Sequence, residues 1–146
     1  MKQEIPQLPF DFRHRLPLQI RFNDVDMFGH VNNAVYVQFM DMGKLAYFKQ
    51  FMAGGFEKEE AVPVVADIHC TYYAPTLIDE RIEVLTALET IGSSSFVLQQ
   101  RIVAADGSVK CTARTVMVNI DTRTGAPTPV SDRWRTALSQ YEGRDL

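Results

Sequence analysis

Apolar and polar residues alternate in five separate segments of the chain, which predicts a strand-rich fold. Over residues 18–24, LQIRFND, the apolar side chains of Leu18, Ile20 and Phe22 fall on one side, as in a half-buried strand. Four later segments are predicted to be strands as well: 64–73, 80–90, 95–104 and 110–120. The last two are separated by an Asp106-Gly107 pair, which favours a tight hairpin turn between antiparallel strands.

One long helix is predicted between the first and second of these strands. It begins near Asn32 or Asn33, because asparagine is a favoured cap, and it continues to about Met52, before the helix-breaking pair Gly54-Gly55. Its apolar residues cover most of the circumference, which is typical of a helix inside a fold. We expect Phe39, Leu45 and Phe48 to be buried, and we expect Gly43 to lie against another part of the backbone.

A short second helix is predicted over residues 131–141, with Ser131 or Asp132 as its cap. Short links between the last strands favour antiparallel pairing. A sheet of this kind, curled around the long helix, would bury the apolar surfaces of both. We therefore expect an α+β fold with a five-stranded antiparallel sheet, in which residues 1–146 form a single domain.

Composition narrows the class of protein without identifying its activity. The chain has 146 residues, 46% of them hydrophobic and 23% charged, and a net charge of −3, which argues against a nucleic-acid partner. No apolar run is long enough for a membrane span, and the first ten residues do not resemble a secretory signal, so we expect a cytoplasmic protein. Cys70 and Cys111 have no metal-binding spacing, and we interpret them as small, reduced strand residues.

The residues that suggest chemistry are concentrated in RFNDVDMFGHVNNAVY, residues 21–36. This segment places Asp24, Asp26, His30, Asn32 and Asn33 between a strand and the start of a helix. The first turn of a helix offers unpaired N–H groups, which can stabilise a developing oxyanion. A carboxylate just before it can act as a nucleophile or as a base for water. Thioester cleavage needs these groups and does not require a metal or a cofactor.

The residue pattern alone leaves other interpretations open. Asp24 can be a turn former that accepts hydrogen bonds from backbone amides. His30 can be a structural histidine with satisfied hydrogen bonds. Asp24, Asp26 and His30 can also form a metal site, although no further Cys or His ligand lies nearby in the sequence.

The same segment resembles the signature of the 4-hydroxybenzoyl-CoA thioesterase-like branch of the hotdog superfamily. The order of the elements is also similar, and the resemblance includes the run DIHCTYYAPTLIDE, residues 67–80. The resemblance implies a hotdog fold, in which the curled sheet wraps around one long central helix. The matching residues are Asp24, Asp26, Gly29, His30, Val31, Asn32, Asn33 and Tyr36, followed on the helix by Asp41 and Lys44.

The resemblance implies roles for individual residues. By resemblance, Asp26 corresponds to the catalytic carboxylate of the family, and a backbone N–H near Asn33 corresponds to an oxyanion donor. His30 is expected to orient the loop or the water. Phe28 stands where related plant acyl-carrier-protein thioesterases have a catalytic asparagine, so their mechanism does not transfer as a whole. The residues expected to contact the substrate are Asp24, Gly29, Asn32, Tyr36 and Tyr72.

We therefore expect an acyl-CoA thioesterase without a cofactor or a metal. The substrate is an acyl group on CoA, with acyl-carrier protein as an alternative carrier, and the resemblance implies a homodimer or homotetramer with sites at the interface. Two other functions remain open on the same fold: a hydroxyacyl-thioester dehydratase and a non-catalytic module that binds acyl thioesters. The dehydratase would have to pair His30 with Asp41 of the helix, which is a poor match.

Overall fold

The computed structural model describes residues 3–53 and 60–146. The helical elements are the 3-10 turn η1 (Phe22–Asp24), α1 (Asn33–Met52) and α2 (Asp132–Glu142). The strands are β1 (His14–Leu18), β2 (Ala61–Tyr72), β3 (Ile82–Ile91), β4 (Ser95–Ala104) and β5 (Val109–Asp121).

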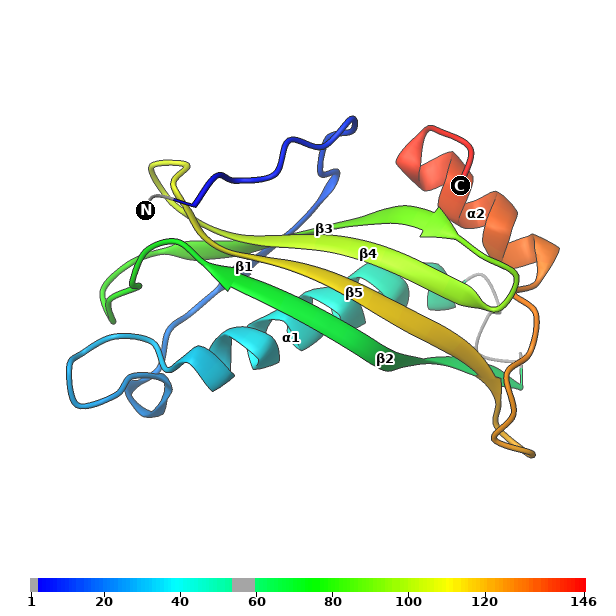
Figure 1. Cartoon of the computed structure of the whole chain (residues 1–146), viewed down its shortest axis with the longest axis horizontal. Helices are drawn as coiled ribbons and strands as arrows, with labels where there is room; N and C mark the ends of the chain where they lie inside the picture. Colours follow the sequence, from blue (N-terminus) through cyan, green and yellow to red (C-terminus); the bar gives the residue numbers. More distant parts are fainter. Residues whose placement is uncertain (1–2, 54–59) are drawn as a thin grey trace.

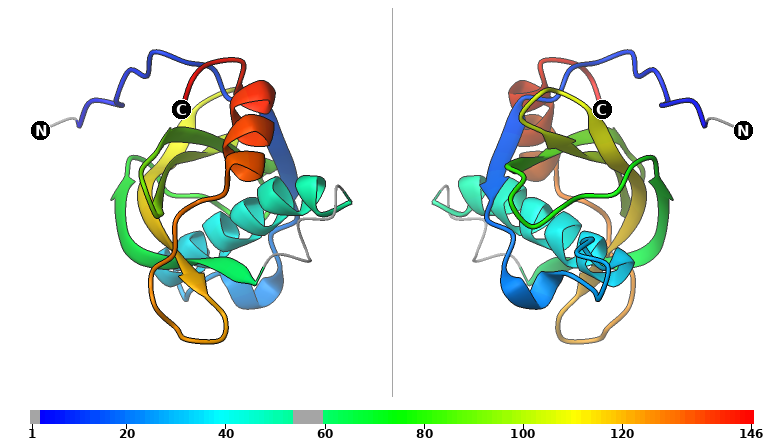
Figure 2. Two further views of the ribbon diagram at one scale, coloured as in Figure 1. Left: turned by 90° about the vertical axis from the view of Figure 1, so that its right-hand side faces the viewer. Right: turned by 90° about the vertical axis from the view of Figure 1, so that its left-hand side faces the viewer.

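The five strands form one antiparallel sheet in the order β1-β3-β4-β5-β2. Figure 1 shows the long helix α1 lying across one face of this sheet, and the views in Figure 2 show the sheet curving around it. The predicted α+β architecture, a curled five-stranded sheet around one long helix, is therefore confirmed. No helix in the described part of the chain is long and apolar enough to cross a membrane.

The first strand lies earlier in the chain than predicted. The alternation over 18–24 suggested a strand there, but β1 ends at Leu18 and η1 occupies the end of that range. The reason is local, because the Asp24 carboxylate accepts hydrogen bonds from the backbone N–H of Arg21 at 2.7 Å and from its guanidinium at 3.0 Å. These bonds close a turn, and Phe22 is left 83% exposed instead of half-buried.

Helix α1 begins where it was predicted, since the Asn32 side chain caps it by accepting a hydrogen bond from Ala34 N–H at 3.0 Å. The predicted stop at Gly54-Gly55 lies outside the described residues. Phe39 and Phe48 are buried as expected. The expectation for Leu45 is wrong, because this side chain is 67% exposed. The sheet of this chain covers only one side of α1, and Leu45 lies on the side that it leaves open.

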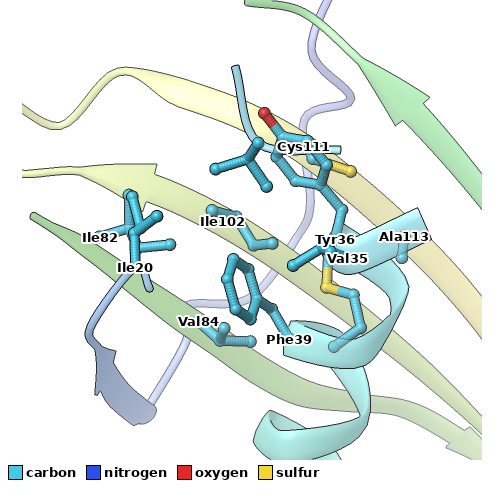
Figure 3. Close-up of a cluster of buried hydrophobic side chains, with 11 residues drawn as sticks. Ile20, Val35, Tyr36, Phe39, Ile82, Val84, Ile102, Cys111 and Ala113 are labelled. Atoms are coloured by element: carbon cyan, nitrogen blue, oxygen red, sulfur yellow. The ribbon is translucent and has the colours of Figure 1, made fainter. Parts of the chain in front are cut away.

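The core lies between α1 and the sheet. Figure 3 shows Tyr36 and Phe39 of α1 among inward-facing side chains of the sheet, including Val84, Ile102 and Ala113. A second apolar cluster lies nearer the end of α1, where α2 adds Trp134 and Leu138.

Gly43 lies against the sheet, as predicted. A Cβ atom at this position would be 2.5 Å from Val84 Cγ1 and 2.9 Å from Gln100 Nε2. We expect Gly43→Leu to lower the free energy of unfolding by roughly 1–3 kcal/mol or more, because the added atoms have no free volume. Thermal unfolding should show a lower Tm for this variant, whereas Gln38→Leu, at an exposed position of the same helix, should change little. An unchanged Tm for Gly43→Leu would contradict the close approach.

The predicted second helix is confirmed as α2, with the Ser131 side chain as its cap. Its last residue, Glu142, is only 4% exposed. Glu142 Oε1 accepts hydrogen bonds from the Tyr47 hydroxyl at 2.6 Å and from Leu88 N–H at 2.8 Å. Because the register of β3 and β4 shifts between Leu88 and Thr90, the carboxylate binds β3 at a bulge. Glu142 thus joins α2 to both α1 and β3.

Candidate active site

The loop between η1 and α1 is folded around Asp26. Asp26 Oδ1 accepts hydrogen bonds from Phe28 N–H at 2.9 Å and from His30 N–H at 3.3 Å. The backbone closes the same loop, because Asp26 N–H donates to the His30 carbonyl at 2.8 Å and Gly29 has a φ of 76°. Asp26 is exposed, and its Oδ2 accepts no hydrogen bond from the residues that the structure describes. The loop therefore fixes one carboxylate oxygen and leaves the other available.

The start of α1 leaves a backbone donor beside this carboxylate. The Asn32 side chain accepts from Ala34 N–H, and the Asn32 carbonyl accepts from Val35 N–H at 2.9 Å. The N–H of Asn33 has no acceptor within residues 3–53 and 60–146. An unpaired N–H at the positive end of a helix is suited to bind an oxyanion.

A hollow of about 360 Å³ brings the three predicted catalytic residues, Asp26, His30 and Asn33, to one surface. Two of the predicted substrate contacts, Tyr36 and Tyr72, line it as well. Its other lining residues are Val31, Tyr73, Ala74 and Pro75. A larger hollow of about 830 Å³ lies between residues 17–20 and 78–83, and none of the predicted catalytic residues lines it.

Asp24, Gly29 and Asn32, which were also predicted to contact the substrate, do not line the smaller hollow. Asp24 is 1% exposed, and the hydrogen bonds from Arg21 hold the pKa of its carboxyl below the usual value although burial acts in the opposite direction. Gly29 supplies the positive φ of the loop, and Asn32 caps α1. These three residues therefore shape the loop and the helix start.

The two tyrosines connect the site to the rest of the fold. The Tyr36 hydroxyl donates to Thr76 Oγ1 at 2.8 Å, and the Tyr72 hydroxyl donates to the Asn33 carbonyl at 2.9 Å. Their rings meet edge to face, with centroids 5.2 Å apart. The end of β2 is thus bonded directly to the first residue of α1.

Sequence reasoning missed Thr76. This residue is fully buried, and its carbonyl accepts a hydrogen bond from Val31 N–H at 2.8 Å. The segment that carries Thr76 is held in place by Lys110, whose ammonium group bonds the Pro75 carbonyl at 3.0 Å and the Glu80 carboxylate at 2.8 Å. In the sequence, the only indication that Thr76 belongs to the site is its position inside the segment of residues 67–80, which resembles the family.

The metal-site alternative receives no support from the geometry. The Asp24 carboxylate turns toward Arg21, whereas Asp26 and His30 line the hollow. Within the described ranges, no three His, Cys, Asp or Glu side chains gather at one point.

The chain is similar to known proteins in both sequence and fold. The chain matches the family described as the thioesterase-like superfamily over residues 20–138. The acyl-CoA thioester hydrolase YbgC of Escherichia coli O157:H7 is 28% identical over 109 residues, which cover 73% of this chain and 81% of YbgC. The uncharacterised protein YsmA of Bacillus subtilis is 26% identical over 121 residues, which cover 83% of this chain and 82% of YsmA.

Among solved structures, a thioesterase from Thermus thermophilus, complexed with coenzyme A and Zn, is 29% identical to this chain. The two structures superpose with a TM-score of 0.82, over 92% of this chain and 98% of the other. Because the family match extends over most of the chain and the fold agrees, the chain belongs to the thioesterase-like superfamily and has the hotdog fold of its thioesterases.

Proposed function

We propose that the protein hydrolyses acyl-CoA thioesters, with Asp26 as its catalytic carboxylate. The observation that supports this most directly is that Asp26, with one carboxylate oxygen free, and Asn33, with its backbone N–H free, line the same hollow. An attacking group and an oxyanion donor on one surface are the minimum that thioester cleavage requires. YbgC is named an acyl-CoA thioester hydrolase, and the similar thioesterase from Thermus thermophilus is complexed with coenzyme A, which supports CoA as the carrier.

In this proposal the thioester carbonyl oxygen lies at the Asn33 N–H. Attack on the carbonyl carbon moves an electron pair onto that oxygen, and collapse of the tetrahedral intermediate expels the CoA thiolate. If Asp26 is the nucleophile, the product is a mixed anhydride that water then cleaves. If Asp26 is a general base, it removes a proton from water, which attacks directly. The backbone N–H of His30 donates a hydrogen bond to Asp26 Oδ1, and His30 lines the same hollow. In this proposal, His30 holds the loop in the reactive geometry.

Release of free CoA thiol from a panel of short-chain, long-chain and aromatic acyl-CoAs tests this function. We expect turnover of at least one member of the panel without an added cofactor. Single turnover in ¹⁸O-labelled water, followed by mass analysis of the acid product and of the peptide that contains Asp26, then tests for the mixed anhydride. Label enters the Asp26 carboxylate only if Asp26 is the nucleophile and water cleaves the anhydride at the Asp26 carbonyl. An unlabelled peptide with a labelled acid indicates that water attacks the acyl carbon, either directly or at the anhydride. Binding of acyl-CoA without thiol release would contradict the proposal and favour a non-catalytic binding module.

We also propose that two copies of the chain pair through β2. This strand is an edge of the sheet, with 12 residues against 5 in β1 at the other edge. Its valines Val62, Val64 and Val65 are 41%, 39% and 46% exposed, and α1 leaves Met42 and Leu45 exposed as well. An open edge flanked by apolar side chains is a ready surface for pairing with a second strand.

Light scattering should therefore report a dimer, or a dimer of dimers, at micromolar concentration. Val65→Lys should shift the mass toward that of one chain, because a desolvated ammonium group opposes pairing. Ile78→Lys is the matched control, since Ile78 is 41% exposed but lies in the loop before β3. A wild-type protein of monomer mass would exclude the pairing.

A further inference from the structure

Two tyrosine rings, one from α1 and one from β2, form a wall of the candidate active site. The rings of Tyr36 and Tyr72 meet at an interplanar angle of 75°. Tyr36 is only 3% exposed, whereas Tyr72 is 42% exposed and lines the hollow together with Asp26 and Asn33. Tyr72 therefore presents its ring to the hollow, and the Tyr36 ring packs against it edge to face.

Both rings are held in place at their hydroxyl ends. Tyr36 donates to Thr76, and Tyr72 donates to the carbonyl of Asn33. A tyrosine phenol is a protonated donor at neutral pH, and burial raises the pKa of both of these phenols further. Swinging either ring aside would break its hydrogen bond, so these bonds favour the arrangement in which both rings form the wall.

The space behind this wall is filled by the core. In the β2–β5 register, Tyr72 is paired with Cys111, which is fully buried, and Cys70 packs against the same cluster. Figure 3 shows Tyr36 next to Cys111 in this cluster, together with Ile102. Protein cores are close-packed, so an acyl chain that reaches the two rings has no path onward between α1 and the sheet.

We propose that the Tyr72 ring sets the upper limit on acyl length and that the substrates are thioesters of short or compact acids. This inference rests on the proposed thioester hydrolysis. The hollow is open to solvent, so its depth, which the two rings and the core behind them limit, decides how much of an acyl chain is buried. Burial of one methylene group of the acyl chain raises binding affinity about fourfold, and a methylene that stays in solvent gives no such gain. Catalytic efficiency should therefore stop rising once the acyl chain is longer than a few carbons.

The test compares kcat/KM over straight-chain acyl-CoAs from acetyl to dodecanoyl for the wild type, Tyr72→Phe and Tyr72→Ala. We expect the wild type to prefer the shorter half of the series. Tyr72→Ala removes the ring and should raise the ratio of octanoyl to butanoyl efficiency at least roughly tenfold. Tyr72→Phe keeps the ring and loses only the bond to Asn33, so its ratio should match that of the wild type although its kcat falls. Tyr72→Val, with a strand-forming side chain, repeats the test if the alanine variant does not fold.

A Tyr72→Ala variant that loses activity equally on all chain lengths would overturn the inference, since that result indicates a structural role only. A wild type that prefers long chains would overturn it as well, while the proposed hydrolysis would stand. A wild type that cleaves no thioester would overturn the proposed function, and this inference with it.

Discussion

Asp26→Asn should reduce the kcat of thioester hydrolysis on the order of 10²-fold or more, the scale expected for a positioned base or nucleophile. The asparagine Oδ1 can accept the same two hydrogen bonds, from Phe28 N–H and His30 N–H, so the loop should keep its shape. What changes is the second oxygen, which becomes an amide nitrogen with neither charge nor basicity. Steady-state kinetics should therefore show a loss in kcat with a smaller change in KM.

Asp24→Asn is the matched control, because it makes the same chemical change two residues away. Asp24 is buried and bonded to Arg21, so this variant should unfold at a lower temperature but keep most of its turnover. Thermal unfolding and kinetics measured on both variants separate the two roles. A nearly normal kcat in Asp26→Asn, together with an inactive Asp24→Asn or His30→Ala, would overturn the assignment.

Glu142→Ala should destabilise the fold by about 3–5 kcal/mol, which is the range for removing one partner of a buried charged network. The variant leaves the Tyr47 hydroxyl and Leu88 N–H without their acceptor, and it removes the carboxylate that lies 3.7 Å from the Arg144 guanidinium. For a chain of this length the loss corresponds to a fall in Tm of roughly 10 °C.

Glu142→Gln distinguishes the hydrogen bonds from the charge. The glutamine Oε1 can still accept from Tyr47 and Leu88, so we expect a clearly smaller fall in Tm than for alanine. The two variants should differ mainly in calorimetric or circular-dichroism melting. Equal and small effects of both substitutions would show that α2 contributes little to holding β3.

Features encoded by neighbouring residues could be predicted from the sequence. The start of α1 depends on Asn32 and the residues just after it, and Asp26 and Asn33 come together because they flank the same short loop. The same local logic explains the error in the first strand. The alternation over 18–24 is present in the sequence, but the bonds between Asp24 and Arg21 turn the chain there.

Features that depend on register between distant segments could not be predicted. Tyr72 is 39 residues from Asn33, and Thr76 is 40 residues from Tyr36, so no spacing rule connects them. The burial of α1 was overestimated for a related reason. Apolar residues all around a helix indicate that the helix is covered, but they do not tell which side is covered by the same chain. Leu45 lies on a side that this chain leaves exposed.

The carboxylate of Glu142 also constrains when the fold can be completed during translation. Its two hydrogen-bonding partners lie 95 and 54 residues earlier in the chain. The hairpins of β3, β4 and β5 can pair as they leave the ribosome, but the amide at the β3 bulge gains its acceptor only after Glu142 emerges. At about 5–20 residues per second, the nascent chain holds this part of its core open for roughly 3–10 s. During that interval Tyr47 and Phe48 lack the cover of α2.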